Sequence, residues 1–284
     1  MSDFYYVNSE NRTIDLSKAP YIGMRSNTLL DFEWQFITQG QAVQRIVKFE
    51  KQMVEKQFHV VVSGIDETDY YRNLDRFIQY TDVDIDHLTP GRLYVGKYYL
   101  RCYIYANTKE RRYLGTNKSL ISVSVVAENG NWQSEELFSY ANGCQGTGYT
   151  TGGIDYKYDY NYDFAAPFDK NAILNESYME TDFELTFYGP YQNPSVEIGG
   201  NTYTIYYYVV SGEYIKINSQ KKTVKLIKHN GAEENLFRYR DRDNYIFKKI
   251  RGGVSRVEAD ADLEWDIKLF YERSEPKWSS ARWI

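Results

Sequence analysis

The sequence predicts a mainly β chain of two domains, and three observations support this fold class. Aromatic residues make up 17% of the 284 residues, and 29 of them are tyrosines, a residue that favours the half-buried surface of a pleated sheet. Short apolar segments bounded by Gly, Pro and Asn recur at sandwich-like spacing through the second half. Only one segment has the periodicity of a convincing helix. The length suits one large or two ordinary domains.

The first elements alternate between clear and ambiguous patterns. Residues 29–37 mix apolar and acidic side chains around Trp34 and predict a strand. In 39–56 the apolar residues fit a helix about as well as a pair of strands. Residues 58–62 form a β-branched run that stops at Gly64 and predict a buried strand.

Residues 66–81 predict a helix. Asp66 is a suitable N-cap, and Glu67 and Asp69 suit the positive end of the helix dipole. One face carries residues at i, i+3, i+4 and i+7 spacing: Tyr70, Tyr71, Leu74, Phe77, Ile78 and Thr81.

Pro90-Gly91 breaks the chain after this helix, and residues 92–106 and 119–127 predict strands. A soft boundary follows at 129–132. We therefore expect an N-terminal domain over 1–132 and a C-terminal domain over 133–284.

Residues 141–153 are rich in Gly, Thr and Asn and predict a linker or loop. In 155–163 tyrosines alternate with polar residues, which predicts a strand with a tyrosine ladder, Tyr156, Tyr158, Tyr160 and Tyr162. Packing within the core or between subunits is the favoured interpretation of this ladder, and a platform for glycans is the alternative.

The remaining strands are expected at 183–188, 203–210, 214–217 and 223–227, with a tight turn at Asn230-Gly231. The longest alternation runs from 257 to 269 and predicts one last strand. Its polar face carries five carboxylates, those of Glu258, Asp260, Asp262, Glu264 and Asp266. They repel one another, so this face is expected to meet water, an acidic passage or a neighbouring subunit.

Charge and targeting signals narrow the function classes. The net charge is −5 and the pI is near 5.4, which speaks against a stable, sequence-reading contact with nucleic acid. The N-terminal residues do not have the pattern of a signal peptide, and no apolar run is long enough to span a bilayer. We expect synthesis in the cytoplasm, no membrane insertion, and two reduced thiols at Cys102 and Cys144.

The sequence offers no catalytic, cofactor-binding or metal-binding residues that we would select. His59, His87 and His229 are scattered and have no ligand at metal spacing. Residues 82–86 resemble the start of a calcium loop, but the glycine and the bidentate glutamate are missing, so a polar exit from the helix is expected. Residues 146–148 do not complete a phosphate-binding glycine pattern. We therefore expect a protein that is not an enzyme and has no cofactor.

Several short sequence segments, taken in their order along the chain, resemble segments of the distal tail proteins of long-tailed phages that infect Gram-positive bacteria. They cover residues 4 to 278 and lie at 4–9 with 14–16, 91–99 after the helix, 131–132, 155–160, 188–190 with 193–194, 212–215, 218–219, 222–224, 247–253 and 272–278. Each segment alone is weakly specific, and the resemblance depends on the order in which the segments occur.

The resemblance implies an N-terminal ring domain, a split β-barrel or sandwich with one helix, and a C-terminal galectin-like β-sandwich. It implies a hexameric hub at the virion tail tip that joins the tail tube protein to the tail-associated protein and the receptor-binding apparatus. DNA would cross its centre only in transit. The family has no catalytic residues to carry over.

The chain departs from the family in two ways. It has no room for an inserted carbohydrate-binding module, and it has Gly252 before Gly253 where the family often has proline. A glycan-binding tail lectin or adhesin remains the alternative function, suggested by the aromatic excess, and an enzyme acting on cell-wall polymers is a third class with no catalytic set behind it.

Overall fold

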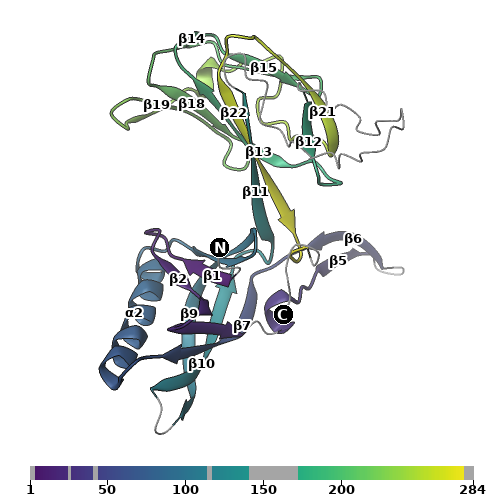
Figure 1. Ribbon diagram of the computed structural model, residues 1–284. Coiled ribbons are helices and arrows are strands. Elements are labelled where there is room, and N and C mark those ends of the chain that lie inside the picture. The colour runs from purple at the N-terminus through teal and green to yellow at the C-terminus, as the bar shows by residue number, and fades with distance from the viewer. Residues whose placement is uncertain (1–3, 25–26, 41–43, 114–116, 141–171, 278–284) are drawn as a thin grey trace, which may run out of the picture. The chain divides into compact units, whose positions relative to one another are not determined.

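The computed structural model describes residues 4–24, 27–40, 44–113, 117–140 and 172–277 (Figure 1). By its internal contacts the chain divides into two units, one of residues 1–134 with 272–284 and the other of residues 135–271. Both units are built from antiparallel strands, which confirms a mainly β fold.

The first unit contains these elements: β1 (Phe4–Val7), β2 (Thr13–Asp15), β3 (Ser17–Lys18), β4 (Tyr21–Met24), α1 (Asn27–Leu30), β5 (Gln35–Gln39), β6 (Arg45–Glu50), β7 (Val54–Ser63), α2 (Glu67–Asp86), β8 (Gly91–Val95), β9 (Tyr98–Tyr113), β10 (Lys118–Ala127) and the start of β11 (Trp132–Tyr140). The second unit contains the rest of β11, then β12 (Ala172–Asn175), β13 (Asp182–Tyr188), β14 (Tyr191–Gln192), β15 (Ser195–Ile198), β16 (Asn201–Thr204), β17 (Tyr208–Val209), β18 (Tyr214–Asn218), β19 (Thr223–Ile227), β20 (Glu233–Asn235), the 3₁₀ turn η1 (Phe237–Tyr239), β21 (Gly253–Ala259) and most of β22 (Trp265–Arg273).

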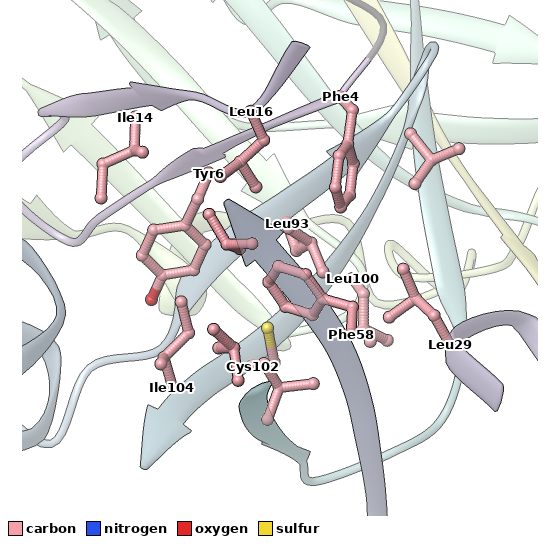
Figure 2. Packing of buried hydrophobic residues seen from close by; sticks show 14 of the residues in the cluster. Phe4, Tyr6, Ile14, Leu16, Leu29, Phe58, Leu93, Leu100, Cys102 and Ile104 are labelled. Atoms are coloured by element: carbon pink, nitrogen blue, oxygen red, sulfur yellow. The ribbon is translucent and has the colours of Figure 1, made fainter. Parts of the chain in front are cut away.

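Strand β9 organises the first unit, because it pairs with different partners along its length. Its first residues pair with β8, which continues through β1 to β2. Its later residues pair with β10, followed by β7, β4 and β3. The inward side chains of both halves meet in one apolar core, where Tyr6, Phe58 and Cys102 lie together (Figure 2).

The helix expected at 66–81 is confirmed as α2, and the Asp66 side chain accepts a hydrogen bond from the Asp69 N–H at 2.7 Å, as an N-cap does. Tyr70, Phe77 and Thr81 are buried as the periodicity predicts, whereas Tyr71 is 45% exposed. The helix continues to Asp86.

Two strand predictions in the first unit need correction. Leu29 and Leu30 belong to the short helix α1 and are buried in the core, so the strand of 29–37 begins only at Gln35. The strand expected at 92–106 is two strands, because Gly96 adopts φ 61° and turns the chain between β8 and β9. Glycine reaches this left-handed region without the strain that other residues meet.

The second unit is a sandwich. One sheet has the order β20, β19, β18, β13, β22, β11, and the other has the order β12, β21, β15, β16. Leu185 and Ile217 of the first sheet share a buried cluster with Val196 and Ile198 of the second. The strands expected at 183–188, 214–217 and 223–227 are confirmed as β13, β18 and β19.

The single strand expected at 257–269 is wrong. The chain turns at 260–264, with the Leu263 N–H donating to the Asp260 carbonyl at 3.1 Å, and β21 and β22 lie in different sheets. The apolar alternation continues through the turn because Leu263 is also buried, so the pattern alone does not mark the break. The segment expected at 203–210 is likewise divided between β16 and β17.

The two contact units differ from the expected domains of 1–132 and 133–284. The first change of unit falls between Ser134 and Glu135, and residues from Glu272 onward group with the first unit. There the Glu272 carboxylate accepts hydrogen bonds from Asn131 and Gln133, both at 3.0 Å. The alternation of apolar and polar residues in β22 does not show where the strand leaves the second unit, between Tyr271 and Glu272.

Candidate interaction surfaces

Two of the histidines and the described cysteine, Cys102, have contacts that indicate roles in the fold. His59 contacts Glu110 at 3.0 Å on an exposed sheet face, and His87 is the C-cap of α2. Cys102 is buried, and its burial raises the pKa of the thiol to about 12. Cys144, the loop of 141–153 with its glycines at 146–148, and the tyrosine ladder of 155–163 lie outside the described residues.

Within the described ranges, no group of three His, Cys, Asp or Glu side chains is placed to hold a metal ion. Over the same ranges, no helix is long and apolar enough to cross a membrane.

Residues 82–86 form the last turns of α2, so the expected polar exit from the helix is wrong. Asp84 faces the core and is fully buried. Its carboxylate accepts hydrogen bonds from the Tyr6 hydroxyl and, at 2.6 Å, from the Ser9 N–H. Asp84 thereby fastens the end of the helix to β1 and the turn that follows it. It was missed from the sequence because its two donors lie more than 70 positions away.

The acidic face expected from Glu258 to Asp266 does not exist as one strand face, because the break at 260–264 divides it. Asp260 accepts a hydrogen bond from the Tyr191 hydroxyl, and Asp266 accepts one from the Tyr188 hydroxyl, both at 2.6 Å. The hydrogen bond to Asp260 is the main cause that raises the pKa of Tyr191 to about 12. These carboxylates orient tyrosines, which a period-two pattern cannot reveal.

The segment of ambiguous periodicity, 39–56, supplies β6 and the start of β7, so the strand interpretation is correct. Strands β5 and β6 pair only with each other in the described chain and form a two-stranded sheet, here called the apolar hairpin (Figure 1). Phe36 lies directly opposite Phe49, and the register shifts by one residue after Ile37.

The apolar hairpin exposes an unusual amount of apolar surface. Seven large side chains on it or at its base are between 45% and 68% exposed: Trp34, Phe36, Ile37, Ile46, Val47, Phe49 and Met53. An isolated two-stranded hairpin is marginally stable in water, and exposed apolar patches of this kind mark interaction sites. The apolar hairpin is therefore a candidate interaction surface.

Two lysines hold the base of the apolar hairpin to the rest of the first unit. Lys51 donates to Asn131 at 2.5 Å and to Ser274 at 2.9 Å, and its Nζ lies 4.7 Å from the centre of the Trp34 ring. Lys56 is 4% exposed and donates to the Asp31 carbonyl. Burial lowers the pKa of both amines. The base is therefore fixed while the apolar residues beyond it are uncovered.

The second unit has an open polar groove of about 520 Å³ over β14, β15, β16 and β21. It is lined by one aromatic ring, by amide and hydroxyl side chains, and by carboxylates, among them Tyr191, Gln192, Asn193, Glu197, Glu258 and Asp260. A single ring with several planar polar groups could accept a hydrophilic ligand.

Comparison with known proteins finds similar solved structures but no match by sequence. No protein-family model matches the chain, and no curated protein matches it. A chain in the structure of the phage P2 baseplate in its activated conformation with Ca has a TM-score of 0.59 and 15% identity, covering 96% of this chain and 98% of that one. The same baseplate with Sr gives the same values.

The crystal structure of SPP1 Dit, described as a paradigm of hub adsorption apparatus in phages infecting Gram-positive bacteria, has a TM-score of 0.58 and 9% identity. It covers 95% of this chain and 99% of that one. The chain therefore has the fold of phage baseplate proteins. More narrowly, it has the two-unit fold of the distal tail (Dit) proteins along nearly its whole length.

Proposed function

We propose that this protein is the structural hub of a long non-contractile phage tail tip and forms a hexameric ring. The observation that carries the proposal is the apolar hairpin on a chain with the distal tail fold. A closed ring needs the same two complementary surfaces on every subunit, and an uncovered apolar ribbon is suited to be one of them. Its occupant in this proposal is a second copy of the chain.

The ring would join the tail tube protein to the tail-associated protein and the receptor-binding apparatus, and DNA would pass through its centre. A net charge of −5 suits this passage, because a basic lumen would retain DNA. The protein would be made in the host cytoplasm and end at the tail tip of the virion. We propose no catalytic step and no cofactor.

Mass photometry and negative-stain electron microscopy of the purified chain test the proposal. Wild type is expected to form rings of six subunits. The double variant Phe36→Ser with Phe49→Ser is expected to give monomers, because it removes the two phenylalanine rings that face each other on the hairpin from the proposed subunit interface. Lys48→Ser is the control, since Lys48 lies next to Phe49 on β6, opposite Ile37, and forms an ion pair only with Glu50 among the described residues. A wild-type chain that is monomeric at every concentration and absent from assembled tails would refute the hub.

A glycan-binding tail lectin is the second candidate, and the polar groove carries it. Tyr191 would stack on a sugar ring, and the carboxylates would accept hydrogen bonds from hydroxyl groups. Binding of cell-wall oligosaccharides that is lost in Tyr191→Ala and kept in Tyr178→Ala would support it, since Tyr178 is a fully exposed tyrosine that does not line the groove. Equal binding by both variants would count against the groove.

A further inference from the structure

The second unit carries a cluster of two cations and three aromatic rings that the proposed function does not use. It consists of Lys222, Phe237, Arg240, Tyr245 and Phe247, here called the cation–aromatic cluster. Lys222 comes from the β18–β19 turn, Phe237 from η1, and the others from the coil between η1 and β21. The fold thus gathers residues from separate segments at one place.

The rings hold both cations in fixed positions. The guanidinium carbon of Arg240 lies 3.8 Å from the centre of the Phe237 ring. Phe237 is stacked with Phe247 at 5.9 Å and an interplanar angle of 7°. The Lys222 Nζ lies 5.4 Å from Phe247 and 5.5 Å from Tyr245. Both cations therefore lie within the range of cation–π attraction from these rings.

Neither cation is neutralised by a carboxylate among the described residues. Other lysines of the same unit do have carboxylate partners. Lys249 forms an ion pair with Asp182 at 2.7 Å, and Lys228 forms one with Glu234 at 2.8 Å. Within the described part of the chain, the Arg240 side chain makes one hydrogen bond, from its Nη1 to the Phe237 carbonyl at 2.9 Å. Its remaining N–H groups are left to receive an anion.

The backbone at Lys222 supports a role for its side chain. Lys222 adopts φ 53°, in the left-handed region that favours glycine. A side chain there costs about 1 kcal/mol or more. Glycine would form the same turn with less strain, yet the chain has a lysine here, and its amine lies near two rings. Strain of this kind concentrates at functional sites.

Further exposed aromatics border the cluster. The Tyr206 N–H donates to the Tyr239 carbonyl at 2.8 Å, so the coil between β16 and β17 that carries Tyr206 runs beside η1. Tyr206 is 55% exposed and Tyr245 is 59% exposed. Arg238 lies over the Tyr239 ring at 4.7 Å. Tyrosine, phenylalanine and arginine together are the composition of energetically important protein interfaces.

We propose that the cation–aromatic cluster docks an acidic segment of a protein partner. Carboxylates of the partner would pair with Arg240 and Lys222, and its apolar side chains would cover the exposed edges of Phe237 and Tyr245. Sugars and nucleobases bind through free ring faces, whereas here Arg240 lies over the Phe237 ring and Lys222 lies near the Phe247 and Tyr245 rings, so two cations accompany the aromatic surface. Charge complementarity with carboxylates therefore identifies the partner, and the proposal does not depend on ring formation.

The test measures fluorescence anisotropy of a labelled peptide of about ten alternating Glu and Leu residues against the full-length chain. A Gln-Leu peptide of the same length and a poly(glycerol phosphate) chain are the comparison probes. The variant Lys222→Gly with Arg240→Gln is expected to lower affinity for the Glu-Leu peptide about tenfold, equivalent to about 1.4 kcal/mol. Because Lys222→Gly relieves backbone strain, a loss of binding cannot be assigned to unfolding if thermal stability is kept.

The matched control is Lys225→Gln with Lys249→Gln, which removes the same charge from lysines that already have carboxylate partners. This control should keep wild-type affinity. The proposal is overturned if the control weakens binding as much as the cluster variant, or if the Gln-Leu peptide binds equally well. It is also overturned if the Glu-Leu peptide shows no binding at about 1 mM, or if poly(glycerol phosphate) binds more tightly through the same two residues, which would assign the surface to phosphodiester polymers.

Discussion

The buried carboxylate of Asp84 is expected to depend on the Tyr6 hydroxyl, and Tyr6→Phe tests this. Both residues are fully buried, and Asp84 forms no ion pair in the described part of the chain. The carboxylate also lies near the C-terminal, negative end of the α2 dipole. Burial raises the pKa of Tyr6 far above its ordinary value, so the hydroxyl stays protonated and remains a donor.

The size of the effect follows from the partners that remain. A hydrogen bond to a charged group contributes about 1.5–3 kcal/mol, and in Tyr6→Phe only the Ser9 N–H, among the described residues, still donates to the Asp84 carboxylate. We expect a loss of about 2 kcal/mol. Asp84→Ala, which removes the acceptor of both donors, should lose about 3 kcal/mol. Asp84→Asn should lose about 1–2 kcal/mol, because its amide can accept from Ser9 and donate to the Tyr6 oxygen but leaves the Tyr6 hydroxyl proton without its acceptor.

Urea denaturation gives the free energy of unfolding, and hydrogen exchange at the Ser9 amide reports on the site locally. In a double-mutant cycle, Tyr6→Phe and Asp84→Ala should be non-additive by about 1–2 kcal/mol. The reasoning is refuted if Tyr6→Phe changes stability by less than about 0.5 kcal/mol, or if the two costs add without coupling.

The second unit and the tyrosines allow two further predictions. A Cβ at Gly252 would lie 2.4 Å from the Ser177 carbonyl oxygen, so Gly252→Ala should cost about 2 kcal/mol or more in thermal unfolding. Gly253→Ala is the matched comparison, with φ 84° but open space, and should cost about 1 kcal/mol; equal costs would contradict the clash. Burial raises the pKa of Tyr21 and of Tyr140 to about 12. The fold keeps protons there that the unfolded chain releases near pH 10, so stability should be full below about pH 10 and fall as the pH rises to 12, as measured by urea midpoints.

Local patterns predicted the elements whose signals lie within a few residues. The cap at Asp66 and the helical spacing of Tyr70 and Phe77 specify α2, because both signals act within the helix itself. The alternation in β13 and β18 likewise reflects one buried face of a sheet. Order along the whole chain carried the resemblance to distal tail proteins, although 9–15% identity to the solved structures leaves only a weak signal at each position.

Features that depend on distant partners could not be predicted. Asp84 was placed in a polar exit because its donors, Tyr6 and Ser9, come from another part of the chain. The break between β21 and β22 was missed because the two strands enter different sheets while Leu263, in the turn, is still buried. The cation–aromatic cluster also needs the folded turn to bring Lys222 to Phe247.

The ambiguous apolar periodicity of residues 39–56 is explained by the exposure of the apolar hairpin. A strand in a sandwich has one face to the core and one to water, which gives the period of two that identifies it. On β6, Ile46, Val47 and Phe49 are all exposed, so neither face meets the core of this chain. A ribbon that is to be covered on both faces by a partner has no reason to keep the alternation, and its apolar residues then fit helical spacing equally well. The failure of the periodicity is therefore what the proposed burial of the hairpin between subunits would produce.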